Sequence, residues 1–346
     1  MKSQKRNRRK LNNHSFLLMI TICLFIVMYV IGMIVFADKG FARTQMFLNL
    51  FINNAGLIVI ACGMTIVMIT GGIDISVGSL TALTCMILAD GMENRGFNAV
   101  SMLIFVLVIG LLFGVVQGFL VGYLKVQPFI VTLAGMFFAR GMTAVISTNM
   151  ISIQNETFKT WAQTQIFLPF GGYVNKNGVT VLPYIYPTVL VALIVLIIVF
   201  IVLKYTKFGR SLYAVGGNEQ SALMMGLNVK RTKMLAYILS SFLCAIGGFL
   251  YCLNSCAGFV EQAKGLEMNA IASSVIGGTL LTGGVGNPIG SLFGVLTSGT
   301  IESFITTQGT LSSWWTRIAI AALLCFFIVL QSILGSTKRK QRRAEA

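Results

Sequence analysis

The chain has little charge, few acidic residues and almost no histidine. Only 10% of its 346 residues are charged and 56% are hydrophobic, whereas about a quarter are charged in ordinary soluble domains. The single histidine, His14, stands in the basic N-terminal segment, and the seven cysteines include no CxxC pair. A soluble fold is therefore excluded, no metal site is expected, and no nucleophile–base pair indicates a membrane enzyme.

The sequence also lacks the GxxxxGK[ST] loop that cradles nucleotide phosphates, so we expect the chain itself to bind no ATP or other cofactor. It carries no basic stripe with interleaved aromatic residues, although its net charge is +16. Most Lys and Arg residues instead lie beside hydrophobic runs, in 1–15, 204–233 and 338–343. The positive-inside rule describes this enrichment of Lys and Arg in cytoplasmic segments. The net positive charge is therefore explained by membrane topology and does not indicate nucleic-acid binding.

Long apolar runs are present, among them Phe16–Phe36 and Met102–Tyr123. Runs of about 20 residues match the hydrocarbon thickness of a bilayer. We therefore predict an all-α polytopic membrane protein with about ten transmembrane helices, at 16–36, 47–69, 76–91, 99–122, 128–147, 186–203, 233–253, 268–282, 287–305 and 316–334. The first run exceeds the apolar core of a signal peptide, about 7–15 residues, and is interpreted as an uncleaved span.

The distribution of charge orders the chain in the membrane. Basic tails at 1–15 and 336–346 and the basic loop 204–232 are expected to be cytoplasmic, whereas 148–185 is expected to form an irregular outer loop. The transmembrane domain between the tails covers 16–335. Spans 2–5 and 7–10 then begin on opposite sides of the membrane. This topology predicts two inverted repeats, although sequence identity between the halves is too weak to prove them.

The segment Gly217–Val229, inside the basic loop, has the composition of a short capped helix. Asn218 can cap its N-terminus, Glu219 lies in the first turn where the helix dipole favours an anion, and Gly226 can close the C-terminus. The intervening residues are small or apolar: Ser221, Ala222, Leu223, Met224 and Met225. Such a helix suits insertion into a groove on another protein. A helix lying on the membrane surface is the alternative.

Two glycine-rich segments, 70–79 and 276–290, interrupt the apolar pattern. Free backbone groups at membrane depth are tolerated only where protein or a water-filled cavity satisfies them, so these breaks predict a translocation path or gate. Close helix packing through small residues is the alternative. The residues assigned to the path or gate are Gly71, Gly72, Asp74, Ser76, Gly78, Asn53, Thr132, Asn269, Gly277 and Gly278.

Few ionisable residues fall inside the predicted spans. Arg140 and Glu302 are interpreted as an intramembrane ion pair, and the alternative is that each faces water at the outer rim. Asp74, at the first glycine break, is expected to cap a half-helix through backbone N–H groups. The scarcity of buried charge suits a neutral, hydrogen-bonding solute.

Three segments resemble the sugar-type permeases of the ribose and galactose ABC importers: Gly71–Gly78, Tyr213–Asn218 and Asn269–Thr279. The similarity covers nearly the whole chain in order, apart from the basic tails. Glu219, Ala222 and Gly226 resemble the coupling-helix motif E-A-A-x-x-x-G by which such permeases dock on their ATPase. Gln220 and Ser221 depart slightly from that motif.

Within this family, Pro128–Phe138 with Arg140, and Gly309–Trp315, are most similar to one of the two permeases of the galactofuranose importer. The resemblance implies a subunit, without ATPase activity of its own, that moves a monosaccharide across the bacterial cytoplasmic membrane. Galactofuranose is the preferred substrate, and ribose, xylose or another pentose or hexose are the alternatives.

The implied partners are an ABC ATPase that binds the ATP, an extracytoplasmic sugar-binding protein, membrane lipid, and a second permease. The resemblance favours a heterodimer with a related chain over a homodimer. A secondary transporter or channel that works without ATP is the rival class, and it has no need of a capped cytoplasmic helix. The residues assigned to ATPase coupling are Asn218, Glu219, Ser221, Ala222, Leu223, Met225 and Gly226.

Overall fold

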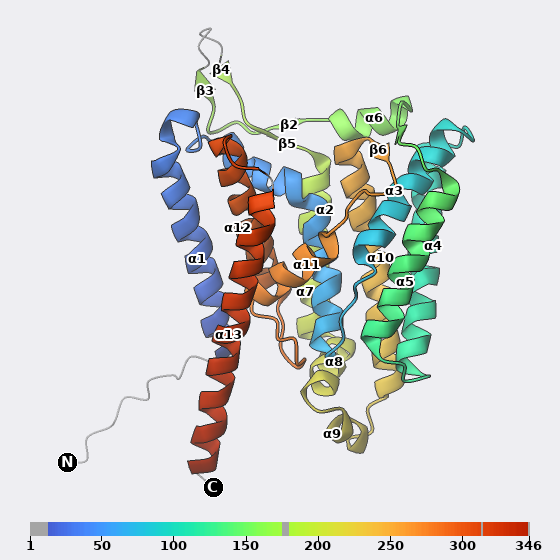
Figure 1. Cartoon of the computed structure of the whole chain (residues 1–346), viewed down its shortest axis with the longest axis vertical. Helices are drawn as coiled ribbons and strands as arrows, with labels where there is room; N and C mark the ends of the chain where they lie inside the picture. Colours follow the sequence, from blue (N-terminus) through green and yellow to red (C-terminus); the bar gives the residue numbers. More distant parts are fainter. Residues whose placement is uncertain (1–12, 175–179, 313, 345–346) are drawn as a thin grey trace, which may run out of the picture.

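The computed structural model describes residues 13–174, 180–312 and 314–344, and most regular structure in them is helical (Figure 1). Eight helices in these ranges are long and apolar enough to cross a membrane. They are α1 (Asn13–Val35), α2 (Thr44–Ile69), α4 (Ala99–Gly122), α5 (Pro128–Ile146), α7 (Pro187–Tyr205), α10 (Val229–Ser255), α12 (Pro288–Gln308) and α13 (Trp314–Ala344). The prediction of an all-α polytopic membrane protein is confirmed.

The other two predicted spans correspond to shorter helices, α3 (Val77–Glu93) and α11 (Leu266–Ile276). The 11 residues of α11 rise only about 16 Å, roughly half of the hydrocarbon core. Protein surrounds both helices: α3 packs against α4, α5 and α10, and α11 packs against α2, α12 and α13. Each of them adjoins one of the glycine-rich breaks.

Short elements occupy the two ends of the helical bundle (Figure 1). One end of the bundle, here called the strand end, carries the 3₁₀ helix η1 (Ala37–Lys39) and α6 (Glu156–Gln163). It also carries the strands β1 (Ile151–Ser152), β2 (Ile166–Phe167), β3 (Tyr173–Val174), β4 (Thr180–Val181), β5 (Tyr184–Ile185) and β6 (Ala257–Gly258). These strands form three antiparallel pairs, β1 with β6, β2 with β5 and β3 with β4. The segment predicted to be irregular, 148–185, therefore contains a short helix and paired strands.

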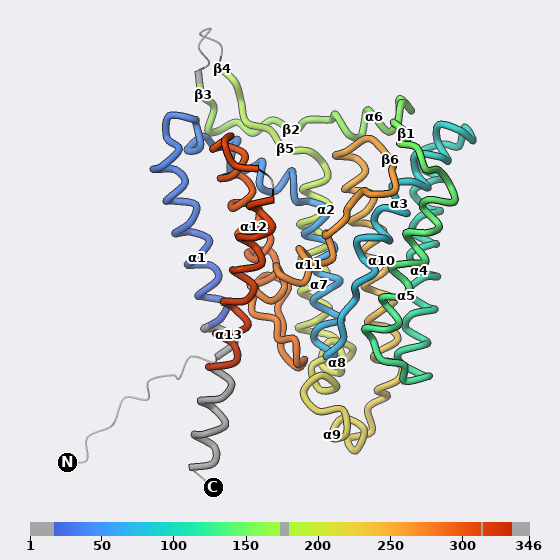
Figure 2. Tube along the Cα trace, in the orientation of Figure 1, coloured from blue at the N-terminus to red at the C-terminus, as the bar shows by residue number. Residues whose placement is uncertain are grey.

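The opposite end, here called the α9 end, carries α8 (Lys207–Gly217) and α9 (Glu219–Met224). Helices α8 and α9 lie together at this end (Figure 2), and the beginning of α1 and the end of α13 lie there too (Figure 1). The two predicted cytoplasmic tails and the basic loop are thus attached to one face of the molecule.

Asparagine and proline set many of the helix starts. The side chains of Asn98, Asn155, Asn218, Asn228 and Asn287 each accept a backbone N–H at the start of a helix. Proline occupies the first turn of α5, α7 and α12, where its missing N–H costs no intrahelical hydrogen bond. Local sequence therefore determines where these helices begin, independently of the lipid-facing residues.

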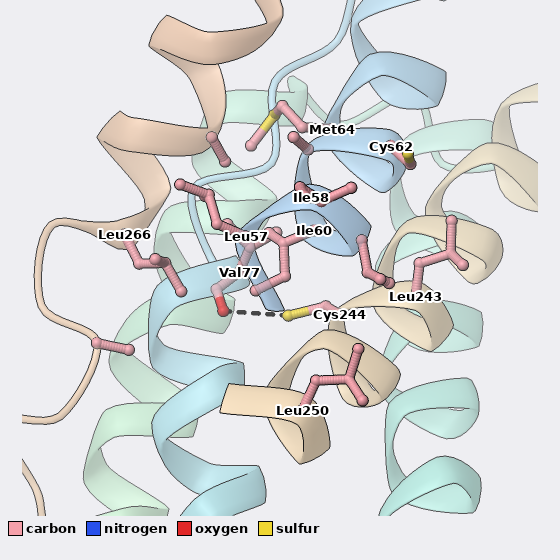
Figure 3. Close-up of a cluster of buried hydrophobic side chains, with 14 of the residues drawn as sticks. Leu57, Ile58, Ile60, Cys62, Met64, Val77, Leu243, Cys244, Leu250 and Leu266 are labelled. Atoms are coloured by element: carbon pink, nitrogen blue, oxygen red, sulfur yellow. Dashed lines mark hydrogen bonds between the residues drawn. The ribbon is translucent and has the colours of Figure 1, made fainter. Parts of the chain in front are cut away.

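The core is built on α2, in which every residue from Asn54 to Ile69 is buried. Apolar side chains of α2 pack with those of α3 and α10 (Figure 3). Cys244 of α10 donates to the Val77 carbonyl of α3 at 3.1 Å. This part of α2 is therefore surrounded by protein on all sides.

A row of glycines on α4 lets this helix approach α10 closely. Gly110, Gly114, Gly118 and Gly122 recur every four residues, and a β-carbon at any of them would lie within 3.0 Å of an atom of α10. Small residues at this spacing allow two helix backbones to touch in membranes. The sequence carries this signal plainly, and it explains why α4 and α10 form an extensive contact.

The predicted inverted repeats correspond to α2–α5 and α10–α13. Helix α2 packs against α10, α11 and α12, whereas α10 packs against α2, α3 and α4. Likewise α3 contacts α5, and α11 contacts α13. Exchanging the two groups of helices reproduces these contacts, and α2 and α10 run in opposite directions through the bundle (Figure 1). This arrangement is the one expected of inverted repeats.

Candidate coupling and translocation sites

Helix α9 begins and ends as its sequence predicts. The Asn218 side chain accepts the Ser221 backbone N–H at 2.8 Å. At the other end, the Leu227 N–H donates to the Ala222 carbonyl at 3.1 Å and the Gly226 N–H donates to the Leu223 carbonyl at 3.0 Å. These two bonds form a Schellman cap, which requires a left-handed residue. Gly226 supplies it, with φ of 77°.

One face of α9 anchors the helix and the other is open. Ala222 is fully buried, in a cluster with Val215 of α8 and Val229 of α10. Three apolar side chains remain exposed, by 58% for Leu223, 82% for Met224 and 67% for Met225. Exposed apolar side chains gathered on one short helix indicate a binding surface.

An ion pair and a cavity adjoin α9. The Glu219 carboxylate contacts the Lys233 ammonium of α10 at 2.7 Å. A cavity of about 670 Å³ lies between the α9–α10 segment and the α4–α5 connection, lined by Glu219, Leu223, Lys125, Lys230 and Lys233 among others. Lys125, isolated in the sequence, therefore joins the basic residues of the 204–232 loop at the α9 end.

The first glycine break holds a buried polar network around Asp74. This carboxylate accepts the Ser76 hydroxyl at 2.5 Å, the Ser76 N–H at 3.1 Å and the Ser240 hydroxyl at 3.0 Å. The Gln117 amide donates to the Ser76 hydroxyl at 3.0 Å. Asp74 thus accepts only one backbone N–H, and its other partners are hydroxyls. The sequence predicts that Asp74 caps a half-helix through backbone N–H groups. Its carboxylate instead connects the first glycine break to α10 through the Ser240 hydroxyl.

Other residues at this break fill the available space. A β-carbon at Gly72 would lie 2.4 Å from the Tyr237 hydroxyl, and one at Gly78 would lie 2.0 Å from a Glu267 carboxylate oxygen. Thr132 of α5 donates to the Ile73 carbonyl at 3.3 Å. Asp74, Ser76 and Thr132 are fully buried, so the first break is packed protein here and not an open path.

The second break contains a close contact between α11 and α12. A β-carbon at Gly277 would lie 2.3 Å from the Gly290 carbonyl carbon. Gly278 is left-handed, with φ of 89°. The Thr21 hydroxyl of α1 donates to the Ile276 carbonyl at 2.6 Å and satisfies an acceptor at the end of α11. Both breaks are therefore held by hydrogen bonds from neighbouring helices.

The two breaks meet each other and the end of α8. The Gly284 N–H donates to the Ile69 carbonyl at the end of α2, at 2.8 Å. A β-carbon at Gly216 of α8 would lie 1.7 Å from the same Ile69 oxygen, and one at Gly283 would lie 2.8 Å from the Gly71 nitrogen. We call this contact of Ile69, Gly71, Gly216, Gly283 and Gly284 the glycine junction.

Tyr213 makes a second connection from α8 to the second break. Its hydroxyl donates to the Gly286 carbonyl at 2.8 Å. Helix α8 leads directly into α9 through Asn218, the residue that caps α9. The open surface of α9 is therefore connected, through one short helix, to both glycine breaks.

The predicted pair of Arg140 and Glu302 is not formed. The guanidinium of Arg140 donates to the backbone carbonyls of Val260 and Gln262, the latter at 2.8 Å. The ion pairs in the described ranges are Arg95–Asp90, Lys233–Glu219 and Lys264–Glu261. The prediction was wrong because the loop after β6 brings carbonyl oxygens to Arg140, and these supply the acceptors that it needs at membrane depth.

The two asparagines predicted to line the path, Asn53 and Asn269, lie in different surroundings. Asn53 is exposed on α2, whereas Asn269 lies in a groove between α2, α11, α12 and α13. Sequence reasoning missed Ser240 and Gln117 in the Asp74 network and Gly216 in the glycine junction. For Gly216 a signal existed, because it falls within Tyr213–Asn218, a segment that carried the family resemblance.

Comparison with known proteins matches most of the chain to one family. The family model described as "Branched-chain amino acid transport system / permease component" matches residues 46–328, from the first turn of α2 into α13. Inner membrane ABC transporter permease protein YjfF of Escherichia coli K12 is 41% identical, over 91% of each chain. No solved structure gives a significant match.

Two further relatives have named substrates. Fructose import permease protein FruG of Bifidobacterium longum is 35% identical over 90% of this chain and 88% of its own. Ribose import permease protein RbsC of Haemophilus influenzae is 32% identical over 92% of this chain and 93% of its own. The chain therefore belongs to this family of permeases, together with these ABC transporter and sugar-import permease proteins.

Proposed function

We propose that this permease imports a monosaccharide, galactofuranose-like by preference, and that α9 is where an ABC ATPase docks on it. The observation that carries the docking proposal is the structure of α9. This helix is capped at both ends, anchored through Ala222, and exposes Leu223, Met224 and Met225. Apolar side chains on a fixed short helix suit a groove on a partner protein.

Charge supports a cytoplasmic location for the α9 end, where an ATPase would bind. Basic residues here lie in α8 or in the first two turns of α10: Lys207, Arg210, Lys230, Arg231 and Lys233. Basic residues beside transmembrane helices are retained in the cytoplasm. Because α1 begins and α13 ends at the α9 end of the bundle, both termini are proposed to be cytoplasmic (Figure 1).

The glycine junction gives the coupling a physical route. When the ATPase moves α9, α8 moves with it, because Asn218 both ends α8 and caps α9. Gly216 then displaces the Ile69 carbonyl and Gly284, which belong to different repeats. Rearranging the two breaks together would let the repeats change between outward-open and inward-open states.

The preference for a galactofuranose-like sugar rests on the resemblance of Pro128–Phe138, Arg140 and Gly309–Trp315. Ribose, fructose, xylose and related sugars are the alternatives. The same resemblance supports a heterodimer with a second, related permease. The importer would be completed by the ATPase and by an extracytoplasmic sugar-binding protein that presents the sugar at the strand end.

The substrate is tested in proteoliposomes that contain this chain, a second permease, the ATPase and the binding protein. We expect ATP-dependent uptake of labelled galactose, as its furanose form, in preference to ribose and xylose, and no uptake of leucine. Apart from Asp74 and Asp90, the buried polar side chains in the described ranges are neutral, which favours a hydroxylated solute over a zwitterion.

Two results of this experiment contradict the proposal. Leucine uptake would assign the chain to amino-acid transport, and sugar flux through this chain alone in ATP-free liposomes would make it a facilitator. Uptake of ribose or fructose ahead of galactose would keep the importer and reject the galactofuranose preference.

The docking surface is tested by Met225→Asp. Met225 is 67% exposed, so the permease should fold and insert normally, but a charge in the apolar contact should weaken ATPase binding. We expect at least a tenfold loss, equivalent to about 1.4 kcal/mol, in co-purification titrations with the ATPase. Met225→Leu keeps the apolar surface and serves as the matched control. Equal ATPase binding by the Asp and Leu variants would remove α9 from the docking site.

A further inference from the structure

A groove with both polar and apolar lining residues lies in the half of the bundle next to the strand end. It has a volume of about 530 Å³ and is formed by α2, α11, α12 and α13. Its lining includes Asn54, ten residues after the start of α2, and Thr306, two residues before the end of α12. Both positions place the groove toward the strand end, away from α9. None of the contacts that hold the two glycine breaks uses this groove.

The groove presents neutral polar groups without partners in the described chain. Ser298 is only 4% exposed, and its hydroxyl makes no hydrogen bond. The Asn269 amide makes none, and Asn54 uses its Nδ2 for the Leu50 carbonyl while its Oδ1 remains free. A buried hydroxyl without a partner is costly at membrane depth, so it indicates that a ligand or water completes the site.

The charges of the groove also point to a hydroxylated ligand. Lys264 is paired with Glu261 at 2.6 Å, and this hydrogen bond holds the pKa of Glu261 below its ordinary value. The Arg317 guanidinium lies over the Trp314 ring, 4.7 Å from its centroid. The Glu302 carboxylate makes no hydrogen bond or ion pair within the described ranges and remains an acceptor.

We propose that this groove is a sugar-binding site on the translocation route, with Ser298, Asn269, Asn54 and Glu302 as its polar groups. The inference rests on the proposed import of a monosaccharide and adds where the sugar binds. Asn side chains both donate to and accept from hydroxyls, and a carboxylate accepts from them. The lining carries one carboxylate and one guanidinium outside ion pairs in the described ranges, those of Glu302 and Arg317, so its charges balance and favour a neutral solute.

The site suits weak binding. Its polar groups are few, Glu302 and Met268 are exposed, and its apolar lining is aliphatic around Leu57 and Leu324. A site that holds the sugar weakly releases it when the repeats rearrange, whereas tight binding would slow transport. Selectivity of the site then comes from which hydroxyls its groups can reach.

The first test measures sugar selectivity in the complete importer with labelled galactose, ribose and fructose. Ser298→Ala, Asn269→Leu and Glu302→Gln should each lower the maximal uptake rate about fivefold, the effect of one ordinary hydrogen bond. They should also change the ratio of the three rates, because each sugar places its hydroxyls differently. Ser303→Ala, a serine on the same helix outside the groove, is the control and should change neither quantity.

A second test measures binding without transport. Thr306→Cys places a thiol at the rim of the groove, where a charged, water-soluble methanethiosulfonate reagent can reach it. Galactose, ribose or fructose at high concentration should slow this reaction, and the protection should disappear when Ser298→Ala and Asn269→Leu are added. Thr164→Cys at the strand end, outside the groove, should show no protection.

These results separate the two proposals. Protection without ATP-dependent uptake would support the groove and reject the importer function. Uptake with unchanged sugar ratios in all three variants, or no protection of Thr306→Cys by any of the three sugars, would overturn the groove as a sugar site. A loss of uptake that is equal for all three sugars would show a structural role only and would also overturn it.

Discussion

Replacing Gly216 with alanine is expected to uncouple ATP hydrolysis from sugar uptake. A β-carbon at this position would lie 1.7 Å from the Ile69 carbonyl oxygen and 2.5 Å from the Gly284 nitrogen. Backbone atoms cannot yield as a flexible side chain would, so α8 must separate from the glycine junction. We expect uptake to fall at least about tenfold, the effect of 1.4 kcal/mol on a rate, while the reconstituted ATPase still hydrolyses ATP.

The neighbouring glycine supplies a matched control. A β-carbon at Gly217 would meet no atom within 4 Å, and both substitutions raise helix propensity by a similar amount. Gly217→Ala should therefore retain normal uptake per ATP hydrolysed. If Gly216→Ala transports as well as Gly217→Ala at equal expression, the glycine junction does not transmit the motion of α9.

Replacing Asp74 with alanine is expected to destabilise the permease and abolish uptake. The change removes the acceptor for the Ser76 hydroxyl, the Ser76 N–H and the Ser240 hydroxyl, all of which are buried. Donors left unsatisfied in the interior cost about 2–3 kcal/mol in total. Thermal unfolding in detergent measures the loss of stability, and proteoliposome uptake measures the loss of function.

Asp90→Ala is the control for this substitution. Asp90 is bonded to Arg95 and Asn94 near the strand end, and the Arg95 side chain is largely exposed. The Asp90 side chain is itself only 13% exposed, but its ion pair opens to solvent on the Arg95 side, so this variant should lose less stability than Asp74→Ala. Equal melting temperatures for the two alanine variants would contradict the importance given to the Asp74 network.

Hydropathy, together with local helix-capping residues and glycines, predicts much of the fold. The predicted span 99–122 coincides with α4, because Asn98 caps the helix and apolar residues continue to its end. Helix α10 begins at Val229 rather than at 233, because a cap at Asn228 starts the helix within its basic segment. Helix α11 stops at Ile276 rather than at 282, where Gly277 and Gly278 follow. Hydropathy identifies which segments cross the membrane, whereas capping residues and glycines determine where each helix begins and ends.

The candidate site likewise has a part that local sequence predicts and a part that only the folded chain shows. The ends of α9 were predictable, since Asn218 and Gly226 act on residues within a few positions of themselves. The glycine junction was not, because Gly71, Gly216 and Gly284 are distant in the chain and meet only in the folded bundle. Opposite charges at membrane depth suggested that Arg140 and Glu302 would pair. No local pattern shows that carbonyls at Val260 and Gln262 come nearer.

Helix α10 has a consequence for communication between the two faces of the membrane. It starts two residues after the Schellman cap region of α9 and ends beside β6, which pairs with β1 at the strand end. Its 27 residues form a single strut about 40 Å long. A continuous helix can transmit a displacement from either end. Thermodynamic linkage requires the same reciprocity between binding at the two ends. We therefore expect that a binding protein docked at the strand end, as proposed above, alters the affinity of the ATPase for α9, and that the ATPase alters the affinity of the binding protein by an equal factor.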